Sequence, residues 1–217
     1  EGTVVGLYCP AFAQKINVPG DISSAAYFIA AALIIPNSEV RLKNVGINIT
    51  RSGLLQVVES MGANITYENE QVIAGERTAD LIVKHSELSG VTIEGDIIPT
   101  LIDEIPIIVI LAAFAKGKTI IKDAAELKVK ESDRIHSVSE NLLNMGAEIE
   151  PTDDGMIIEG GKPLHVANIS TYMDHRIAMS FYVALLAIGA NDTYLLDFPS
   201  CVSISYPKFF DTFKTLL

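Results

Sequence analysis

The residues best suited to chemistry lie in two charged motifs, at 128–134 (KVKESDR) and 174–176 (DHR). Arginine and lysine side chains bind phosphate and carboxylate groups. A carboxylate beside a lysine, as in Lys130-Glu131, can have a pKa suited to proton transfer. The two motifs therefore predict a site that binds a small anion and moves a proton.

Both motifs also suit the start of a helix. Ser132 can cap a helix that begins at Asp133, and Asp174 can cap the next one. A third start follows Asp103, where Pro106 is allowed in the first turn. Helix N-terminal ends attract anions, so three such ends on one face would strengthen the predicted site.

The distribution of charge agrees with a small anionic ligand at this place. The chain has 27 acidic and 16 basic residues, a net charge of −11. Residues 116–134 are an exception, because they hold six basic and four acidic residues. The overall acidity argues against nucleic acid as a partner. A solvated loop of mixed charge is the alternative explanation of the basic segment.

An internal repeat predicts the architecture, because 58–65 (VESMGANI) returns as 142–149 (LLNMGAEI). Each copy is expected to contain two helices and strands around a left-handed glycine, Gly62 or Gly146. The expected elements are helices Ser23–Ile34 and Ile105–Ala115, strands Glu39–Lys43 and Lys118–Lys122, helices Ser52–Ser60 and Asp133–Asn144, and closing strand pairs Ile65–Glu68 with Gln71–Ala74 and Glu148–Pro151 with Met156–Glu159. The second copy is longer before its second helix, and the additional residues fall within 125–134.

A third, incomplete unit is expected at the end of the chain. It comprises helix His175–Ile188, strand Thr193–Asp197 and helix Tyr206–Leu216, without a closing strand pair. The fold class is therefore α/β, a pseudo-threefold domain of repeated β-α-β-α-β-β units with its apolar first helices inside. Its expected span is 16–217, with repeats at about 16–76, 80–161 and 164–217, after a lead-in segment at 1–15 from another domain or a hinge.

The location of the protein is expected to be cytoplasmic. The longest apolar runs are about half of the ~20 residues that a membrane span needs. Cys9 and Cys201 form no paired framework and are interpreted as reduced thiols. No basic stretch precedes an apolar one, so no signal peptide is expected.

At these motifs the sequence closely resembles the 5-enolpyruvylshikimate-3-phosphate synthase family, the 3-phosphoshikimate 1-carboxyvinyltransferases. The matching segments are 127–134 (LKVKESDR) and 174–179 (DHRIAM), with support from 20–25 (GDISSA), 101–106 (LIDEIP) and 205–207 (SYP). Members of that family are about twice as long and have two similar domains around an active-site cleft. The resemblance implies that this chain corresponds to the C-terminal-half domain.

The resemblance also implies a reaction and its partners. The family transfers the enolpyruvyl group of phosphoenolpyruvate to the 5-hydroxyl of shikimate 3-phosphate by addition–elimination and releases phosphate. This step belongs to chorismate and aromatic amino acid biosynthesis and uses no metal or organic cofactor. The other domain of the enzyme is then a required partner, and the isolated chain is expected to be inactive.

Three residues acquire catalytic roles from the resemblance. Asp103 matches an aspartate that contacts the shikimate hydroxyls and can act as a base. Lys130 matches a lysine that touches the transferred hydroxyl and shares the proton transfer. Glu131 matches a glutamate that can protonate and deprotonate the methyl carbon.

The substrate-binding group is implied in the same way. Arg134 and Arg176 match two arginines that grip phosphoenolpyruvate, and His175 matches a histidine beside them. Two positions depart from many members of the family. Ile204 stands where they have a lysine that binds phosphate, and Glu126 stands where some have an asparagine that contacts shikimate.

Two other functions stay open. One is the sister enzyme, UDP-N-acetylglucosamine enolpyruvyl transferase, which would be expected to use a loop cysteine. Neither Cys9 nor Cys201 lies in a matching loop, and the Lys130-Glu131 pair favours the shikimate enzyme. The other is a ligand-binding domain without catalysis.

Overall fold

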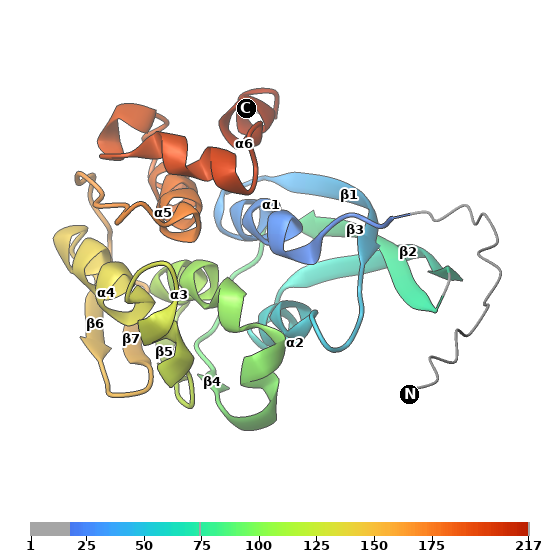
Figure 1. Cartoon of the computed structure of the whole chain (residues 1–217), viewed down its shortest axis with the longest axis horizontal. Coiled ribbons are helices and arrows are strands. Elements are labelled where there is room, and N and C mark those ends of the chain that lie inside the picture. Colours follow the sequence, from blue (N-terminus) through green and yellow to red (C-terminus); the bar gives the residue numbers. More distant parts are fainter. Residues whose placement is uncertain (1–17, 74, 217) are drawn as a thin grey trace, which may run out of the picture.

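The structure is a computed structural model and describes residues 18–73 and 75–216. Helices and strands alternate along the chain (Figure 1). In order, the elements are α1 (Ile22–Ile34), β1 (Glu39–Gly46), α2 (Gly53–Ser60), β2 (Asn64–Ile73), β3 (Glu76–Lys84), β4 (Thr92–Ile93), α3 (Ile105–Phe114), β5 (Gly117–Ile121), α4 (Arg134–Asn144), β6 (Glu148–Pro151), β7 (Met156–Gly160), α5 (His175–Ala187) and α6 (Phe209–Lys214). Short 3₁₀ turns lie at Gly95–Thr100, Ile102–Glu104, Ala125–Val129, Thr193–Leu195 and Pro199–Ile204.

Three helices, α1, α3 and α5, pack against one another in the middle of the molecule (Figure 1). Every residue of α3 from Ile105 to Ala113 is buried, and α1 is buried on nearly all sides. A helix that is apolar all round must be surrounded by other elements. The prediction that the first helices are inside is confirmed.

The two sheets share one strand order. In the second sheet, β4 pairs in parallel with β5, while β5 and β6 flank β7 in antiparallel pairs. In the first, β1 and β2 flank β3, and Gly20 forms a parallel bridge with Val45 of β1. A third parallel bridge joins Ile169 and Leu196 on either side of α5. The same β-α-β pairing thus occurs three times, as a pseudo-threefold domain requires.

The prediction of a closing strand pair in the first unit, Ile65–Glu68 with Gln71–Ala74, is wrong. Residues 65–68 and 71–73 belong to one strand, β2, whose register against β3 shifts between Glu68 and Gln71. The segment Asn69-Glu70 forms this bulge instead of a turn, because Asn69 tolerates its φ of 51° and donates a hydrogen bond to Asp80. The expected first repeat, 16–76, also ends too early, since β3 continues the first sheet to Lys84.

The third unit also differs from the prediction. Thr193–Leu195 is a 3₁₀ turn, so the expected strand Thr193–Asp197 is reduced to the single bridge at Leu196. The last helix, α6, is shorter than the expected Tyr206–Leu216. The expected lead-in at 1–15 lies outside the described residues, and the domain span 16–217 stays a prediction.

Helix ends position the charged motifs. Asp133, and not Ser132, caps α4, since its side chain accepts a hydrogen bond from the His136 amide. Asp174 caps α5 as predicted. Gly62 and Gly146 have φ values of 95° and 86° directly after α2 and α4, as a left-handed helix end needs. The N-terminal ends of α3, α4 and α5 come together through hydrogen bonds of Arg134 to Asp103 and Asp174.

No helix among residues 18–73 and 75–216 is both long enough and apolar enough to cross a membrane.

Candidate active site

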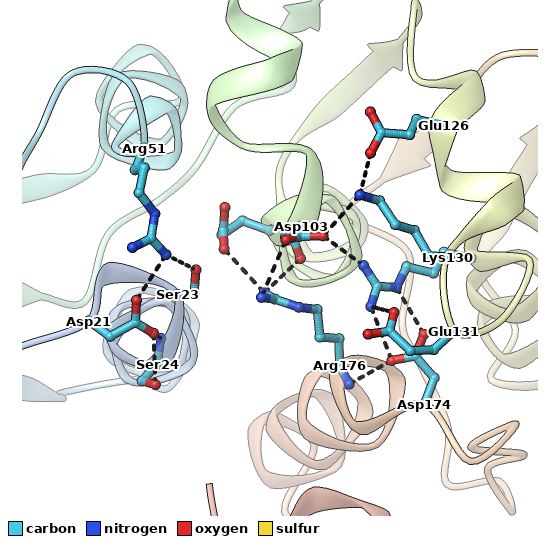
Figure 2. Close-up of polar contacts among 12 residues, drawn as sticks. Asp21, Ser23, Ser24, Arg51, Asp103, Glu126, Lys130, Glu131, Asp174 and Arg176 are labelled. Carbon is cyan, nitrogen blue, oxygen red and sulfur yellow. Dashed lines mark hydrogen bonds and ion pairs between the residues drawn. The ribbon is translucent and has the colours of Figure 1, made fainter. Parts of the chain in front are cut away.

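Asp103 lies at the centre of a charged cluster at these helix ends (Figure 2). It belongs to the 3₁₀ turn that leads into α3. Its Oδ1 accepts a hydrogen bond from Arg134 Nη1 at 3.0 Å and lies 3.5 Å from Lys130 Nζ. Its Oδ2 lies 3.6 Å from Arg176 Nη2. Three cations therefore converge on one half-exposed carboxylate.

Arg134 is the buried core of this cluster. Its Nε donates to Asp174 Oδ2 at 2.8 Å, its Nη1 to Asp103, and its Nη2 to Glu131 Oε2 at 2.5 Å. The Arg134 side chain is 1% exposed, Asp174 is 0% exposed, and Glu131 is 52% exposed. A buried guanidinium needs such partners, because an unpaired charge in the interior is costly. Of the three carboxylates, Glu131 is the most exposed and can leave most easily.

Arg176 is held differently, from one side. Its Nη1 donates to the Asp103 backbone oxygen at 3.0 Å and to Glu104 Oε1 at 3.2 Å. Its Nη2 lies 3.6 Å from Asp103 Oδ2, and the side chain is 15% exposed. Arg176 therefore keeps one edge of its guanidinium for a ligand.

Lys130 bridges two carboxylates, Asp103 and Glu126 (Figure 2). The hydrogen bond to Glu126 raises the pKa of Lys130, and Asp103 adds to this effect. At neutral pH the side chain is therefore a firmly held cation. The glutamate at 126, which replaces an asparagine of some family members, acts here on the lysine.

Burial and the three cations act on Asp103 in opposite directions. Burial alone would raise the pKa of Asp103, but Arg176, Lys130 and Arg134 outweigh it and hold the pKa below its ordinary value of 3.8. The carboxylate is thus ionised at neutral pH.

His175 is buried at the first position of α5, beside these groups. Burial lowers its pKa below the ordinary 6.5, and the neighbouring carboxylates of Asp174 and Glu131 only partly oppose this. A neutral imidazole is therefore favoured at pH 7. Its position agrees with the expected place beside the arginines, while its role stays a prediction.

The turn before Asp174 has an unusual backbone. Tyr172 and Met173 have φ values of 54° and 57°, a region that residues other than glycine rarely adopt. Asp197 stabilises this turn by accepting hydrogen bonds from the Thr171 amide at 2.8 Å and hydroxyl at 2.7 Å. The turn delivers Asp174 to both the α5 cap and the Arg134 side chain.

Sequence reasoning placed all the predicted site residues in one cluster, and the structure brings them together. They are Asp103, Lys130, Glu131, Arg134, His175 and Arg176. The sequence-based prediction gave no role to Glu104 or to Asp197. The motif at 101–106 carried a signal for Glu104, because a glutamate at the start of an otherwise apolar helix is buried with that helix. Nothing in the sequence pairs Asp197 with Thr171.

The basic segment 116–134 divides in two. Lys116, Lys118 and Lys122 pair with exposed glutamates on the surface, at Glu87, Glu159 and Glu94 respectively. Lys130 and Arg134 are the members that reach the cluster. The local excess of basic residues was therefore only partly a signal of the site.

Cations of the chain occupy the carboxylates of this cluster. No group of three or more potential metal-ligating side chains is found among residues 18–73 and 75–216. Its carboxylates, Asp103, Glu131 and Asp174, are paired with arginine and lysine. The donors instead suit an anionic organic ligand.

The buried carboxylates predict how stability depends on pH. Burial would raise the pKa of Asp174, but the hydrogen bonds and charge of Arg134 hold it below 3.8. Such a group stabilises the fold above its unfolded pKa, and this contribution is lost as the pH falls through the lower folded value. Asp103 acts in the same direction. Glu104 acts oppositely, because burial raises its pKa above 4.5, so its contribution is lost as the pH rises from 4.5 through the higher folded pKa.

We therefore expect the free energy of unfolding to fall steeply below about pH 3.8. Urea unfolding from about pH 2 to 7 measures this. When the parent protein unfolds in acid, Asp174 takes up a proton. The Asp174→Asn variant lacks this uptake, so its free energy of unfolding should depend less steeply on pH in the acid range. An equal dependence of the unfolding free energy on pH in both proteins would contradict a lowered pKa of Asp174.

A family model described as EPSP synthase (3-phosphoshikimate 1-carboxyvinyltransferase) matches residues 8–213. This chain belongs to that family. The resemblance inferred from the sequence motifs is thereby confirmed.

Individual relatives agree with the family assignment. A 3-phosphoshikimate 1-carboxyvinyltransferase of Oceanobacillus iheyensis is 52% identical over 202 residues, which are 93% of this chain and 47% of that protein. One from Thermoanaerobacter sp. is 54% identical over 203 residues, or 94% and 48% of the two chains. The chain thus spans about half the length of the curated relatives it matches.

Solved structures confirm the enolpyruvyl transferase-like fold. EPSP synthase from Acinetobacter baumannii superposes with a TM-score of 0.85 at 40% identity, covering 92% of this chain and 46% of that one. The enolpyruvyl transferase NikO from Streptomyces tendae gives a TM-score of 0.67 at 17% identity, over 93% of this chain and 44% of that one. The second likeness supports the fold alone.

Proposed function

We propose that this chain is one half of an enzyme that transfers the enolpyruvyl group of phosphoenolpyruvate to the 5-hydroxyl of shikimate 3-phosphate. The observation that carries the proposal is the convergence of Arg134, Arg176 and Lys130 on Asp103, with Glu131 bound to Arg134, in a chain of the EPSP synthase family. The product would enter chorismate and aromatic amino acid biosynthesis.

The reaction needs an anion-binding group and two proton movements. In the addition step, the 5-hydroxyl oxygen bonds to C2 of phosphoenolpyruvate, the hydroxyl proton goes to a base, and C3 gains a proton to become a methyl group. In the elimination step, the C2–O bond to phosphate breaks and C3 loses a proton. The products are inorganic phosphate and an enol ether.

The charges in the cluster suit these steps. Asp103, held ionised by three cations, is the proposed base for the hydroxyl proton. Lys130, whose pKa is raised, is the proposed cation beside the transferred oxygen. Glu131 is exposed enough to reach a substrate carbon and is the proposed acid and base at C3. Arg176, with Arg134 behind it, would hold the anionic groups of phosphoenolpyruvate.

At position 204 many family members have a lysine that binds phosphate, and this chain has Ile204. The phosphate must therefore be bound by other residues. Ile204 is exposed at the end of a 3₁₀ turn and has no charge to offer. We infer that the other half of the enzyme, or another cation of this chain, replaces the usual lysine at this position.

Residues 1–217 by themselves are expected to release no phosphate above background from phosphoenolpyruvate and shikimate 3-phosphate. The physical reason is that a cleft between two domains offers only one wall when one domain is present. Circular dichroism would first establish that the chain is folded, and phosphate release would then be assayed with and without the complementary domain. Turnover restored by that domain supports the proposal, and turnover by this chain alone at the rate of the complete enzyme contradicts it.

The same assay separates the alternatives. UDP-N-acetylglucosamine in place of shikimate 3-phosphate should give no phosphate release, whereas release would favour the sister enzyme. Phosphoenolpyruvate binding without turnover in the complete protein would favour a ligand-binding domain.

We also propose a cytoplasmic location, because both substrates are water-soluble metabolites. The absence of nucleic acid partners stays a prediction from the acidic net charge of −11.

A further inference from the structure

Glu104 is a buried carboxylate at the active-site end of α3 to which the proposed reaction gives no task. Its side chain is 5% exposed. It occupies the position before the first residue of α3, yet it makes no capping hydrogen bond there. Burying a carboxylate costs free energy unless hydrogen bonds or opposite charges compensate it. The partners of Glu104 therefore indicate what this side chain does.

Those partners come from the other two units of the domain. Glu104 Oε1 accepts a hydrogen bond from Arg176 Nη1 at 3.2 Å, on the first turn of α5. The Ser23 hydroxyl, on the first turn of α1, lowers the pKa of the same carboxyl. The Glu104 side chain therefore lies where the ends of α1, α3 and α5 meet.

Glu104 contacts one edge of the Arg176 guanidinium. Nη1 is fixed between Glu104 Oε1 and the Asp103 backbone oxygen, which lies 3.0 Å away. Both acceptors come from the same turn before α3, so they define the plane of the guanidinium from one side. The opposite edge, with Nη2, remains for a ligand.

Arg134 offers a useful contrast. Its Nε, Nη1 and Nη2 are each hydrogen-bonded to a carboxylate, and its side chain is 1% exposed. Arg176 is the arginine with an available edge, so the grip on phosphoenolpyruvate depends on how Arg176 is oriented. Glu104 is the buried carboxylate that contacts its Nη1.

We propose that Glu104 is a positioning residue that holds Arg176 in the orientation needed to bind phosphoenolpyruvate. The inference rests on the proposed function, since it concerns the same site. Glu104 touches neither substrate and acts through the arginine. Burial raises the pKa of this carboxyl even though Ser23 and Arg176 oppose that effect, which agrees with a group placed for a purpose other than stability.

Glu104→Ala and Glu104→Gln, made in the complete two-domain enzyme, test the proposal. Alanine removes the acceptor, and we expect the KM for phosphoenolpyruvate to rise about tenfold, with a change of about twofold or less in the KM for shikimate 3-phosphate. Glutamine keeps an oxygen at the same place and should restore most of the affinity. Glu159→Gln is the matched control, because it also removes the charge of a carboxylate paired with a basic residue, Lys118, on the β7 surface. Its kinetic constants should stay unchanged.

A double-mutant cycle with Arg176→Lys shows whether Glu104 acts through the arginine. In the Arg176→Lys background, Glu104→Ala should change the KM for phosphoenolpyruvate by about twofold or less. Thermal unfolding of each variant separates positioning from stability, and Glu104→Gln serves if the alanine variant does not fold.

Three results would overturn the inference. They are an unchanged KM for phosphoenolpyruvate in Glu104→Ala, an equal rise in both KM values, or an effect of the same size with and without Arg176. A parent enzyme without enolpyruvyl transfer would instead overturn the proposed function, so the two failures are distinguishable.

Discussion

Replacing Glu131 with glutamine in the complete enzyme should lower kcat by about 10²–10⁴-fold while phosphoenolpyruvate binds more tightly. The loss in rate follows from removing a general acid and base, whose contribution is typically of that size. The gain in binding follows from the contact between Glu131 Oε2 and Arg134 Nη2 at 2.5 Å. In the absence of substrate, this carboxylate occupies Nη2 of Arg134, the arginine that lies behind Arg176 in the proposed anion site.

The opposite signs make the experiment informative. Glutamine has nearly the same shape but no charge, so it competes less well for the guanidinium. Steady-state kinetics give kcat, and the KM for phosphoenolpyruvate gives the trend in binding. Glu148→Gln is the control, because it removes an exposed carboxylate paired with Lys162 at the far end of α4, where no effect on either constant is expected. Unchanged kcat would remove Glu131 from the mechanism, and a higher KM would show that it does not compete with the substrate.

Asp174→Asn should destabilise the domain by about 3 kcal/mol. Asp174 is 0% exposed and is the partner of the 1% exposed Arg134 at 2.8 Å. Removing one member of a buried ion pair typically costs ~3–5 kcal/mol, because the other charge is left without compensation. Asp103 and Glu131 still contact Arg134, so we expect the lower end of this range.

Asp133→Asn is the matched control for this change. Asp133 caps α4 as Asp174 caps α5, through a hydrogen bond to the His136 amide. Asparagine caps a helix as well as aspartate does, so the cost should be below about 0.5 kcal/mol. Urea unfolding of the two variants provides the comparison. Equal stability losses would mean that capping, and not the ion pair with Arg134, accounts for Asp174.

The sequence predicted the regular parts of the fold because they follow local patterns. The apolar periodicity located α1, α3 and α5, and the repeated Met-Gly-Ala segment located the left-handed ends of α2 and α4. The first closing strand pair could not be predicted, since Asn69 is as suitable for a bulge as for a turn. Only the pairing with β3, a contact between distant segments, decides between them.

The site shows the same limit. The types and order of Lys130, Glu131, Arg134 and Arg176 sufficed to predict that they share a site. Which arginine is enclosed by carboxylates and which keeps a free edge depends on contacts across 31 to 73 residues of chain, as between Asp103 and the two arginines. No local rule specifies such contacts.

The strained turn before Asp174 has a consequence for the order of events during synthesis. Arg134 leaves the ribosome 40 residues before Asp174, the partner with which it is buried. The turn that positions Asp174 is stabilised by Asp197, 26 residues after Thr171, which accepts the hydrogen bond from the Thr171 amide. The guanidinium of Arg134 therefore gains its buried partner only after residue 174 has been made. Both sheets end by Gly160, so Asp174 and Asp197, which complete the anion-binding end of this domain, are encoded after the last strand.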